Sequence, residues 1–128
     1  MNAEVINPWT WQEQYGFVHG VAVPSGARTV YVAGQAAVDD QGAPTHAGDI
    51  VAQVGASLDN IEAVLRGAGM TLANVVRLNF YARDVDELFK QFSRVNERFG
   101  DSRYATTVLG VGQLPARFLV MLEATAVD

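Results

Sequence analysis

Residues 76–84 read V-R-L-N-F-Y-A-R-D. Apolar and polar side chains alternate from residue 76 to residue 82, which is the period of a β-strand with one buried face. Asp84 then favours the start of a helix, because its carboxylate can accept free backbone N–H groups of the first turn. Glu87, three residues later, completes the pattern of a capping box. The stretch therefore predicts a half-buried strand that leads directly into a helix.

Helical periodicity occurs on both sides of this strand. Apolar residues recur every three or four positions over residues 49–66, and glycines at 67 and 69 predict the end of that helix. A second helix is predicted over residues 84–99, before Gly100. The apolar stripes are Val51, Val54, Leu58, Ile61, Leu65 and Ala68 in the first helix, and Val85, Leu88, Phe89, Phe92, Val95 and Phe99 in the second.

Four further strands complete the pattern. Residues 17–23 and 28–33 flank a Pro-Ser-Gly turn signal and predict a β-hairpin. Residues 105–111 and 118–127 predict two more strands. The order ββ-α-β-α-ββ predicts an α+β fold, a two-layer sandwich in which two helices cover one face of a mixed β-sheet. We expect one domain over residues 1–128, with association of several sheets to cover the other face.

Composition narrows the class of protein. The chain has 128 residues, 49% of them hydrophobic and 18% charged, so a domain this small is expected to hide apolar surface in an oligomer interface. The net charge of −5 and the scattered basic residues argue against a nucleic-acid partner. There is no cysteine, no apolar run of about 20 residues and no signal-peptide pattern in residues 1–4. We expect a cytoplasmic protein with no membrane partner.

Common motifs for metal and cofactor chemistry are missing from the sequence. It contains no phosphate-binding glycine loop, no H-E-x-x-H pair, no G-x-S-x-G elbow and no cluster with metal-ligand spacing. The sequence therefore predicts neither a metal nor a cofactor.

Five stretches, in order along nearly the whole chain, resemble one known family. They are Y-V-A-G-Q at 31–35, Q-V-G-A-S-L-D-N at 53–60, A-G-M at 68–70, the 76–84 stretch, and L-E-A-T-A-V at 122–127. Together they resemble the Rid family of reactive intermediate deaminases, also called the YjgF or L-PSP endoribonuclease family. The resemblance implies a YjgF/chorismate mutase-like fold.

The resemblance also implies a homotrimer that binds small molecules in clefts between its subunits. Active members of the family hydrolyse reactive enamines and imines to ketoacids and ammonia without a cofactor. In those members an arginine on the fifth strand holds the substrate carboxylate and a glutamate on the last strand positions water. A tyrosine and an asparagine line the cleft.

This chain carries less polar residues at those four positions. Alignment from the Leu-Pro pair at 114–115 places the arginine at Thr106 and the glutamate at Met121, and the tyrosine and asparagine fall on Phe17 and Phe92. We therefore expect weak or absent deamination of the usual 2-imino acids, because a charge-assisted hydrogen bond is lost with the arginine.

The candidate ligand-binding residues follow from this alignment. They are Phe17, Gly34, Gln35, Phe92, Thr106, Thr107, Pro115 and Met121. Several have a structural alternative: Gly34 and Gln35 can form a bulge, and Phe17 and Phe92 can be core residues. Thr106 and Thr107 can be ordinary strand residues.

The catalytic residues stay unassigned, with Thr106, His19 and Glu123 as candidates. His19 can act as an acid or base near neutral pH, or can be a structural histidine. Glu123 matches a noncatalytic acidic position that faces the sheet or an interface partner. Arg103 lies three residues before Thr106, an odd offset that points it to the opposite strand face.

The tryptophans at positions 9 and 11 can fix the N-terminal arm to the body or to a neighbouring subunit, or can cover the cleft as a lid. Three functions remain open for the chain. They are a hydrolase for an imine or enamine less acidic than those of amino acids, a noncatalytic ligand-binding trimer that senses or scavenges, and a structural protein.

Overall fold

The computed structural model of the protein describes residues 3–128. The elements, in chain order, are β1 (Glu4–Ile6), the 3-10 helix η1 (Trp11–Tyr15), β2 (Gly20–Ala22), β3 (Thr29–Gln35), α1 (Ile50–Gly67), η2 (Leu72–Asn74), β4 (Val75–Ala82), α2 (Val85–Phe89), α3 (Phe92–Phe99), β5 (Ala105–Gly110), η3 (Pro115–Arg117) and β6 (Val120–Val127).

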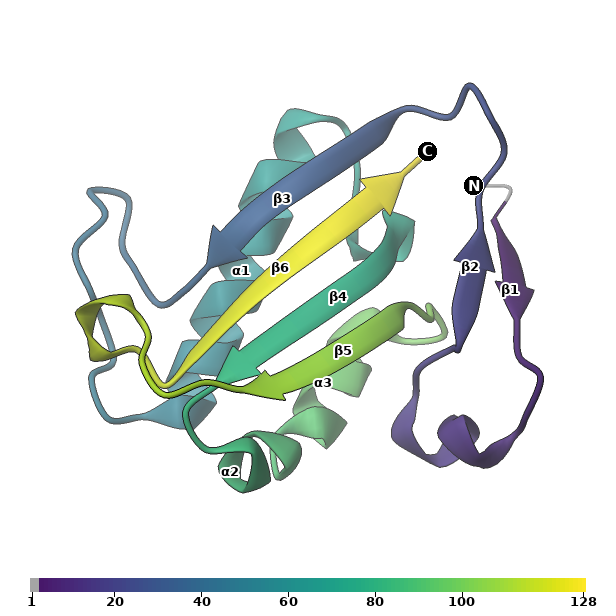
Figure 1. The fold of residues 1–128 in the computed structure, drawn as a ribbon. Helices are drawn as coiled ribbons and strands as arrows, with labels where there is room; N and C mark the ends of the chain where they lie inside the picture. The colour runs from purple at the N-terminus through teal and green to yellow at the C-terminus, as the bar shows by residue number, and fades with distance from the viewer. Residues whose placement is uncertain (1–2) are drawn as a thin grey trace.

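A four-stranded sheet with the order β3-β6-β4-β5 forms the centre of the molecule. β4 and β5 run parallel, whereas β6 is antiparallel to both β3 and β4, so the sheet is mixed. The helices lie together behind this sheet in Figure 1, and the other face is left open. The predicted two-layer α+β fold is confirmed.

The core forms between the sheet and the helices. Buried and less buried residues alternate along β4 and β6, so Leu78, Phe80 and Leu122 turn toward the helices. Leu58, Ile61 and Leu65 of α1 meet them, as the apolar stripe predicts. Within residues 3–128, none of the helices combines the length and the apolar character that crossing a membrane requires.

The predicted hairpin between residues 17–23 and 28–33 is wrong. The turn itself forms, because the Ala27 N–H donates to the Pro24 carbonyl at 3.4 Å. The strands then diverge: β2 pairs with β1, a strand that the sequence did not reveal, and β3 pairs with β6. Val18 holds the arm near β5 by donating its N–H to the Tyr104 carbonyl at 3.1 Å. Figure 1 shows the β1–β2 hairpin apart from the main sheet, beyond the start of β5.

The predicted second helix, residues 84–99, starts as expected and then breaks into α2 and α3. Asp84 accepts the Glu87 N–H at 3.1 Å, but the Gln91 N–H donates to the Leu88 carbonyl, which tightens the backbone into a turn. The break leaves Phe89 48% exposed instead of buried in the stripe. In α1, Val51 is likewise 40% exposed, because Ile50 packs on the core in its place.

Arg98 of α3 ties the two main helices together. Its guanidinium lies 2.8 Å from Asp59 Oδ1 and 2.9 Å from Glu62 Oε1, and it donates to the Gly55 carbonyl at 3.1 Å. The Arg98 side chain is 27% exposed, so solvent screens these contacts less than it screens a surface pair. This bridge helps to hold α3 in position against α1.

We expect Arg98→Met to lower the free energy of unfolding by about 1–2 kcal/mol, because two carboxylates and a carbonyl lose a charged donor. Urea denaturation at fixed protein concentration measures the change. Arg94→Met is the matched control, because Arg94 is an exposed residue of the same helix with no ion pair among residues 3–128. Equal losses in the two variants would show that the bridge contributes nothing beyond net charge.

Candidate functional site

A pocket of about 650 Å³ lies between η1, the α2–α3 turn and β5. We call it the aromatic pocket, because five of its ten lining residues are aromatic. It is lined by Trp11, Gln14, Tyr15, Phe17, Phe89, Phe92, Ser93, Asn96, Thr106 and Val108. Three of the sequence-derived candidates, Phe17, Phe92 and Thr106, therefore meet in one place.

Each of these three residues comes from a different element. Phe17 follows η1 after Gly16, whose φ of +79° turns the chain. Asn96 packs closely against Gly16, because a Cβ added to this glycine would lie 2.7 Å from Asn96 Nδ2. Phe92 begins α3, with its ring 5.1 Å from both Phe80 and Phe89. Phe92 thus belongs to the core and to the pocket wall together.

Thr106 faces the pocket because of the register of β5. It lies opposite Leu78 of β4, a residue that faces the helices, and its Oγ1 donates to the Leu78 carbonyl at 2.6 Å. Thr107 points to the open face, where its Oγ1 accepts a hydrogen bond from Arg77 at 2.9 Å. The two threonines are therefore on opposite sides of the sheet.

Arg103 does not line the aromatic pocket beside Thr106, the position that the family resemblance assigns to an arginine. Its guanidinium donates to the Gly100 and Ser102 carbonyls, both at 2.9 Å, beside the end of α3. It lines a separate hollow of about 230 Å³ with Phe17 and residues of the N-terminal arm, and it is not among the residues of the aromatic pocket.

The N-terminal arm forms an aromatic cluster at the edge of the aromatic pocket. The His19 ring lies 5.0 Å from Trp9, 4.8 Å from Trp11 and 5.7 Å from Phe17. His19 Nε2 is buried and has no hydrogen-bond partner within residues 3–128. Trp11 packs on Phe17 within the arm and also lines the pocket. The two predicted roles of the tryptophans, an anchor for the arm and a cover for the cleft, therefore meet in Trp11.

Gly34, Gln35 and Met121 lie elsewhere, near the end of β3. A Cβ at Gly34 would lie 2.7 Å from Met121 Sδ, so the close approach of the two strands there requires a glycine. The register shifts between Val32 and Gln35, and the Gln35 amide donates to the Ala33 carbonyl at 3.1 Å. The alternative of a β-bulge is thus present at this position.

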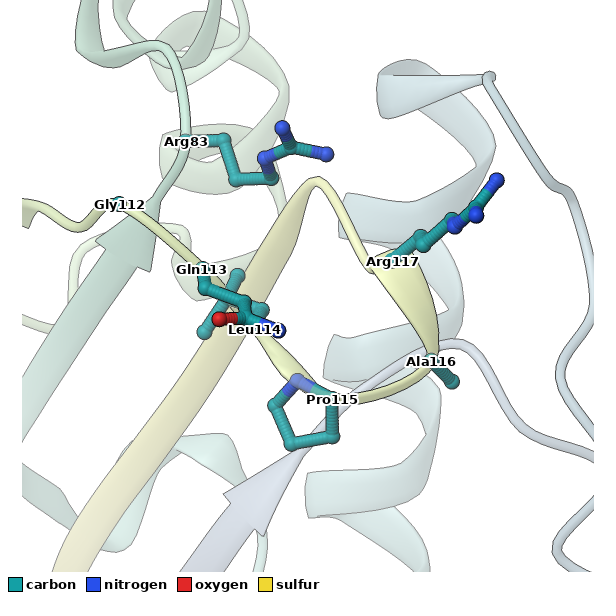
Figure 2. A pocket seen from close by; sticks show the side chains of 7 residues that line it. All are labelled: Arg83, Gly112, Gln113, Leu114, Pro115, Ala116 and Arg117. Carbon is teal, nitrogen blue, oxygen red and sulfur yellow. The ribbon is translucent and has the colours of Figure 1, made fainter.

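Pro115 lines a third hollow, of about 830 Å³, around the loop of residues 112–117. Figure 2 shows the side chains of Arg83 and Arg117 on the two sides of the bend that leads from this loop into β6. Neither arginine makes an ion pair with another residue of the described chain. Ala116 and Arg117 adopt positive φ angles of 51° and 58°, which bring the loop back toward the sheet.

Glu123 lies on the open face of the sheet, within a polar network. Its Oε1 accepts hydrogen bonds from the Tyr81 hydroxyl and from Asn79 Nδ2. The hydrogen bond from Tyr81, followed by that from Asn79, lowers the pKa of Glu123, and the same contact raises the pKa of Tyr81. Glu123 is therefore a paired carboxylate on the face opposite to the aromatic pocket.

Residues 3–128 contain no group of three or more His, Asp or Glu side chains that could hold a metal ion. The aromatic pocket has no charged side chain in its lining, so its chemistry depends on aromatic rings, hydroxyl groups and side-chain amides. The sequence offers Trp11 as one of two possible lid residues. Reasoning from the sequence missed the other lining residues, which are Gln14, Tyr15, Phe89, Ser93, Asn96 and Val108. The exposed break in the second helix is the feature that brings Phe89 into the pocket.

The sequence matches a known family model, and the structure resembles that of a solved protein. A sequence model of the family described as Endoribonuclease L-PSP matches residues 13–128. The structure resembles that of YyfB from Yersinia pestis, a protein of the conserved Rid family, with a TM-score of 0.89 and 36% identity over all of both chains.

Two known protein sequences are also similar. A RutC family protein of Pyrococcus abyssi is 34% identical over 97 residues, which cover 76% of this chain and 76% of the relative. A 2-iminobutanoate/2-iminopropanoate deaminase of Capra hircus is 32% identical over 105 residues, which cover 79% of this chain and 74% of that protein.

We expect the carboxylate of Glu123 to contribute to stability above pH 4.5 and to lose this contribution as the pH falls through its lowered pKa. The difference in unfolding free energy between the protein and Glu123→Gln should therefore shrink between pH 7 and acid pH. Glu97→Gln, which removes an exposed carboxylate with no ion pair in residues 3–128, is the control. A difference that stays constant with pH would contradict the role of the network.

Proposed function

The chain belongs to the endoribonuclease L-PSP family, the family of the Rid and RutC proteins, and from this premise we propose that it binds and hydrolyses a small imine or enamine with an apolar body. The aromatic pocket is the ligand site in this proposal. One observation carries it: Phe17, Phe92 and Thr106 line one pocket of about 650 Å³. The family resemblance assigns these three positions to the tyrosine, asparagine and arginine of active members. Pockets of this volume and this mostly apolar lining suit small molecules.

The replacements determine what the pocket can accept. A carboxylate would bury its charge against aromatic rings without a cationic partner, and such burial is costly. Contact with an apolar body instead contributes about 25 cal/mol for each Å² removed from water. The proposed substrate is therefore less acidic than a 2-imino acid.

The reaction is a hydrolysis that consumes one water. The water oxygen bonds to the imine carbon while one water proton passes to the nitrogen. The second proton then passes from the new hydroxyl group to the nitrogen as the carbon–nitrogen bond breaks, which releases a carbonyl compound and ammonia. No carboxylate or imidazole lines the aromatic pocket. In this proposal hydroxyl and backbone groups hold the water. Thr106 is the hydroxyl residue that β5 contributes to the pocket.

A noncatalytic ligand-binding protein is the second candidate function. The same observation favours it, because an aromatic pocket without an acid or base binds more readily than it catalyses. Release of ammonia from a bound imine separates the two functions.

We further propose that the protein is a homotrimer whose clefts complete the site. Gly34, Met121 and Pro115 lie away from the aromatic pocket in one chain, and a neighbouring subunit could bring its own copies to it. Two features support a covered open face: Tyr31 is 82% exposed, and Asn79 Oδ1 is buried without a partner in residues 3–128. Exposed aromatic surface and unpaired buried polar atoms are both typical of faces that pack against a partner.

We expect little ammonia from 2-iminopropanoate or 2-iminobutanoate, generated in a coupled assay with an amino-acid oxidase or a dehydratase. Thr106→Arg should raise the rate, because it restores a guanidinium for the substrate carboxylate and charged hydrogen bonds contribute about 1.5–3 kcal/mol. Thr107→Arg is the control on the opposite face of the strand. Turnover by the unmodified chain as fast as by the Capra hircus deaminase would overturn the assignment of Thr106.

We expect sedimentation to give three times the chain mass of 13.8 kDa at micromolar concentration. Tyr31→Arg should shift the mass toward one chain, because it adds a charge to the open face. Val64→Arg adds the same charge on the exposed side of α1 and should leave the mass unchanged. A single-chain mass for the unmodified protein would refute the trimer.

A further inference from the structure

Three polar side chains of the aromatic pocket donate hydrogen bonds to the backbone. Thr106 gives its only hydroxyl proton to the Leu78 carbonyl at 2.6 Å. Asn96 Nδ2 donates to the Tyr15 carbonyl and Gln14 Nε2 to the Trp11 carbonyl, both at 3.1 Å. All three side chains thus donate a hydrogen bond to a backbone carbonyl.

The oxygen atoms of these side chains remain free to accept. Within residues 3–128, no donor is bonded to Thr106 Oγ1, Asn96 Oδ1 or Gln14 Oε1. Thr106 can offer a ligand only lone pairs, because a hydroxyl carries one proton. The hydroxyl groups of Ser93 and Tyr15 can act either way. The amides of Asn96 and Gln14 each keep a second N–H, and Ser93 and Tyr15 can donate as well, so four groups can donate to a ligand. Five side-chain oxygens can accept from one, because Thr106 can only accept.

The aromatic walls favour the same kind of ligand. The rings of Trp11, Tyr15, Phe17, Phe89 and Phe92 line the pocket, and no arginine, lysine or histidine lines it. Aromatic faces attract cations through the ring quadrupole, and tryptophan does so most strongly. An anion would meet neither a positive side chain nor a surplus of donors. The net charge of −5 adds a long-range attraction for cations.

We propose that the aromatic pocket selects an organic cation, an amine or protonated imine with an aromatic or aliphatic body and no carboxylate. This inference rests on the proposed function, because it takes the aromatic pocket as the ligand site. The cation would donate its N–H groups to Thr106 and Asn96 while its body and charge contact the aromatic rings. The substrate class is then that of imines formed by oxidation of simple amines.

Three probes of similar size and different charge test the proposal. They are 2-phenylethylamine, which is protonated at neutral pH, the neutral 2-phenylethanol, and the anion 3-phenylpropanoate. Trp11 lines the pocket and the chain has two tryptophans, so quenching of tryptophan fluorescence reports binding. We expect the amine to bind about tenfold more tightly than the alcohol, because the ammonium has more N–H donors than the single O–H of the alcohol and makes a partly desolvated cation–π contact. The carboxylate should bind most weakly.

Two substitutions separate these contributions. Thr106→Val removes the acceptor and keeps the shape, and it should reduce the preference for the amine over the alcohol about threefold. Phe89→Leu removes an exposed ring and should reduce it about threefold. Because Phe89 is half exposed, Phe89→Leu keeps the test decisive if Thr106→Val does not fold. Val64→Ala on α1 is the control for loss of an exposed apolar group and should change nothing.

The results distinguish this inference from the proposed function. Equal binding of the amine and the alcohol, or tighter binding of the carboxylate, would overturn the preference for cations and leave the pocket as a ligand site. The absence of binding by all three probes would overturn both proposals. An amine preference that survives both substitutions would assign the cation site to other residues and overturn the inference as stated.

Discussion

The two-residue period of the central strands decides on which face of the sheet the candidate residues of β5 and β6 lie. Along β6, Leu122 turns to the helices, whereas Met121 and Glu123 turn to the open face. Along β5 the same period sends Thr106 to the aromatic pocket and Thr107 to the open face. A shift of register by one residue would exchange all of these positions. The pairing of β4 with β5 and β6 therefore gives the protein two chemically distinct faces, one aromatic and one polar.

The sequence predicts best the elements whose signals are local. The strand at residues 75–82 and the helix at residues 50–67 could be located from periodicity and glycines, because those patterns reflect burial within one element. The partner of residues 20–22 could not, because strand pairing depends on contacts far away in the chain. The break before Phe92 was also missed, because the stripe continues across it in sequence while the backbone turns.

The residues of the candidate site could likewise be predicted only where the signal in the sequence is local or comes from the family alignment. Alignment to the family brought Phe17, Phe92 and Thr106 to attention, and the fold places them together. For Trp11 the sequence leaves a lid and an anchor as alternatives, because the residue belongs to an arm whose path depends on an unpredicted hairpin. Phe89 is assigned by the sequence to the buried stripe of its helix. It is exposed only because its helix breaks. Periodicity reports which side chains are buried, but a pocket wall is built from side chains that fail to be buried.

In the proposed alignment Thr106 stands where active members of the family carry an arginine, and this change alters the character of the site as well as its strength. An arginine can only donate hydrogen bonds, whereas Thr106, having given its proton to the Leu78 carbonyl, can only accept them. The preferred partner therefore changes from an anion to a donor. The aromatic residues at positions 17 and 92 act in the same direction, since rings attract cations and exclude unpaired anions. Under the proposal, Phe17, Phe92 and Thr106 favour one ligand class although they come from separate parts of the chain, and such agreement is what a selected binding site is expected to show.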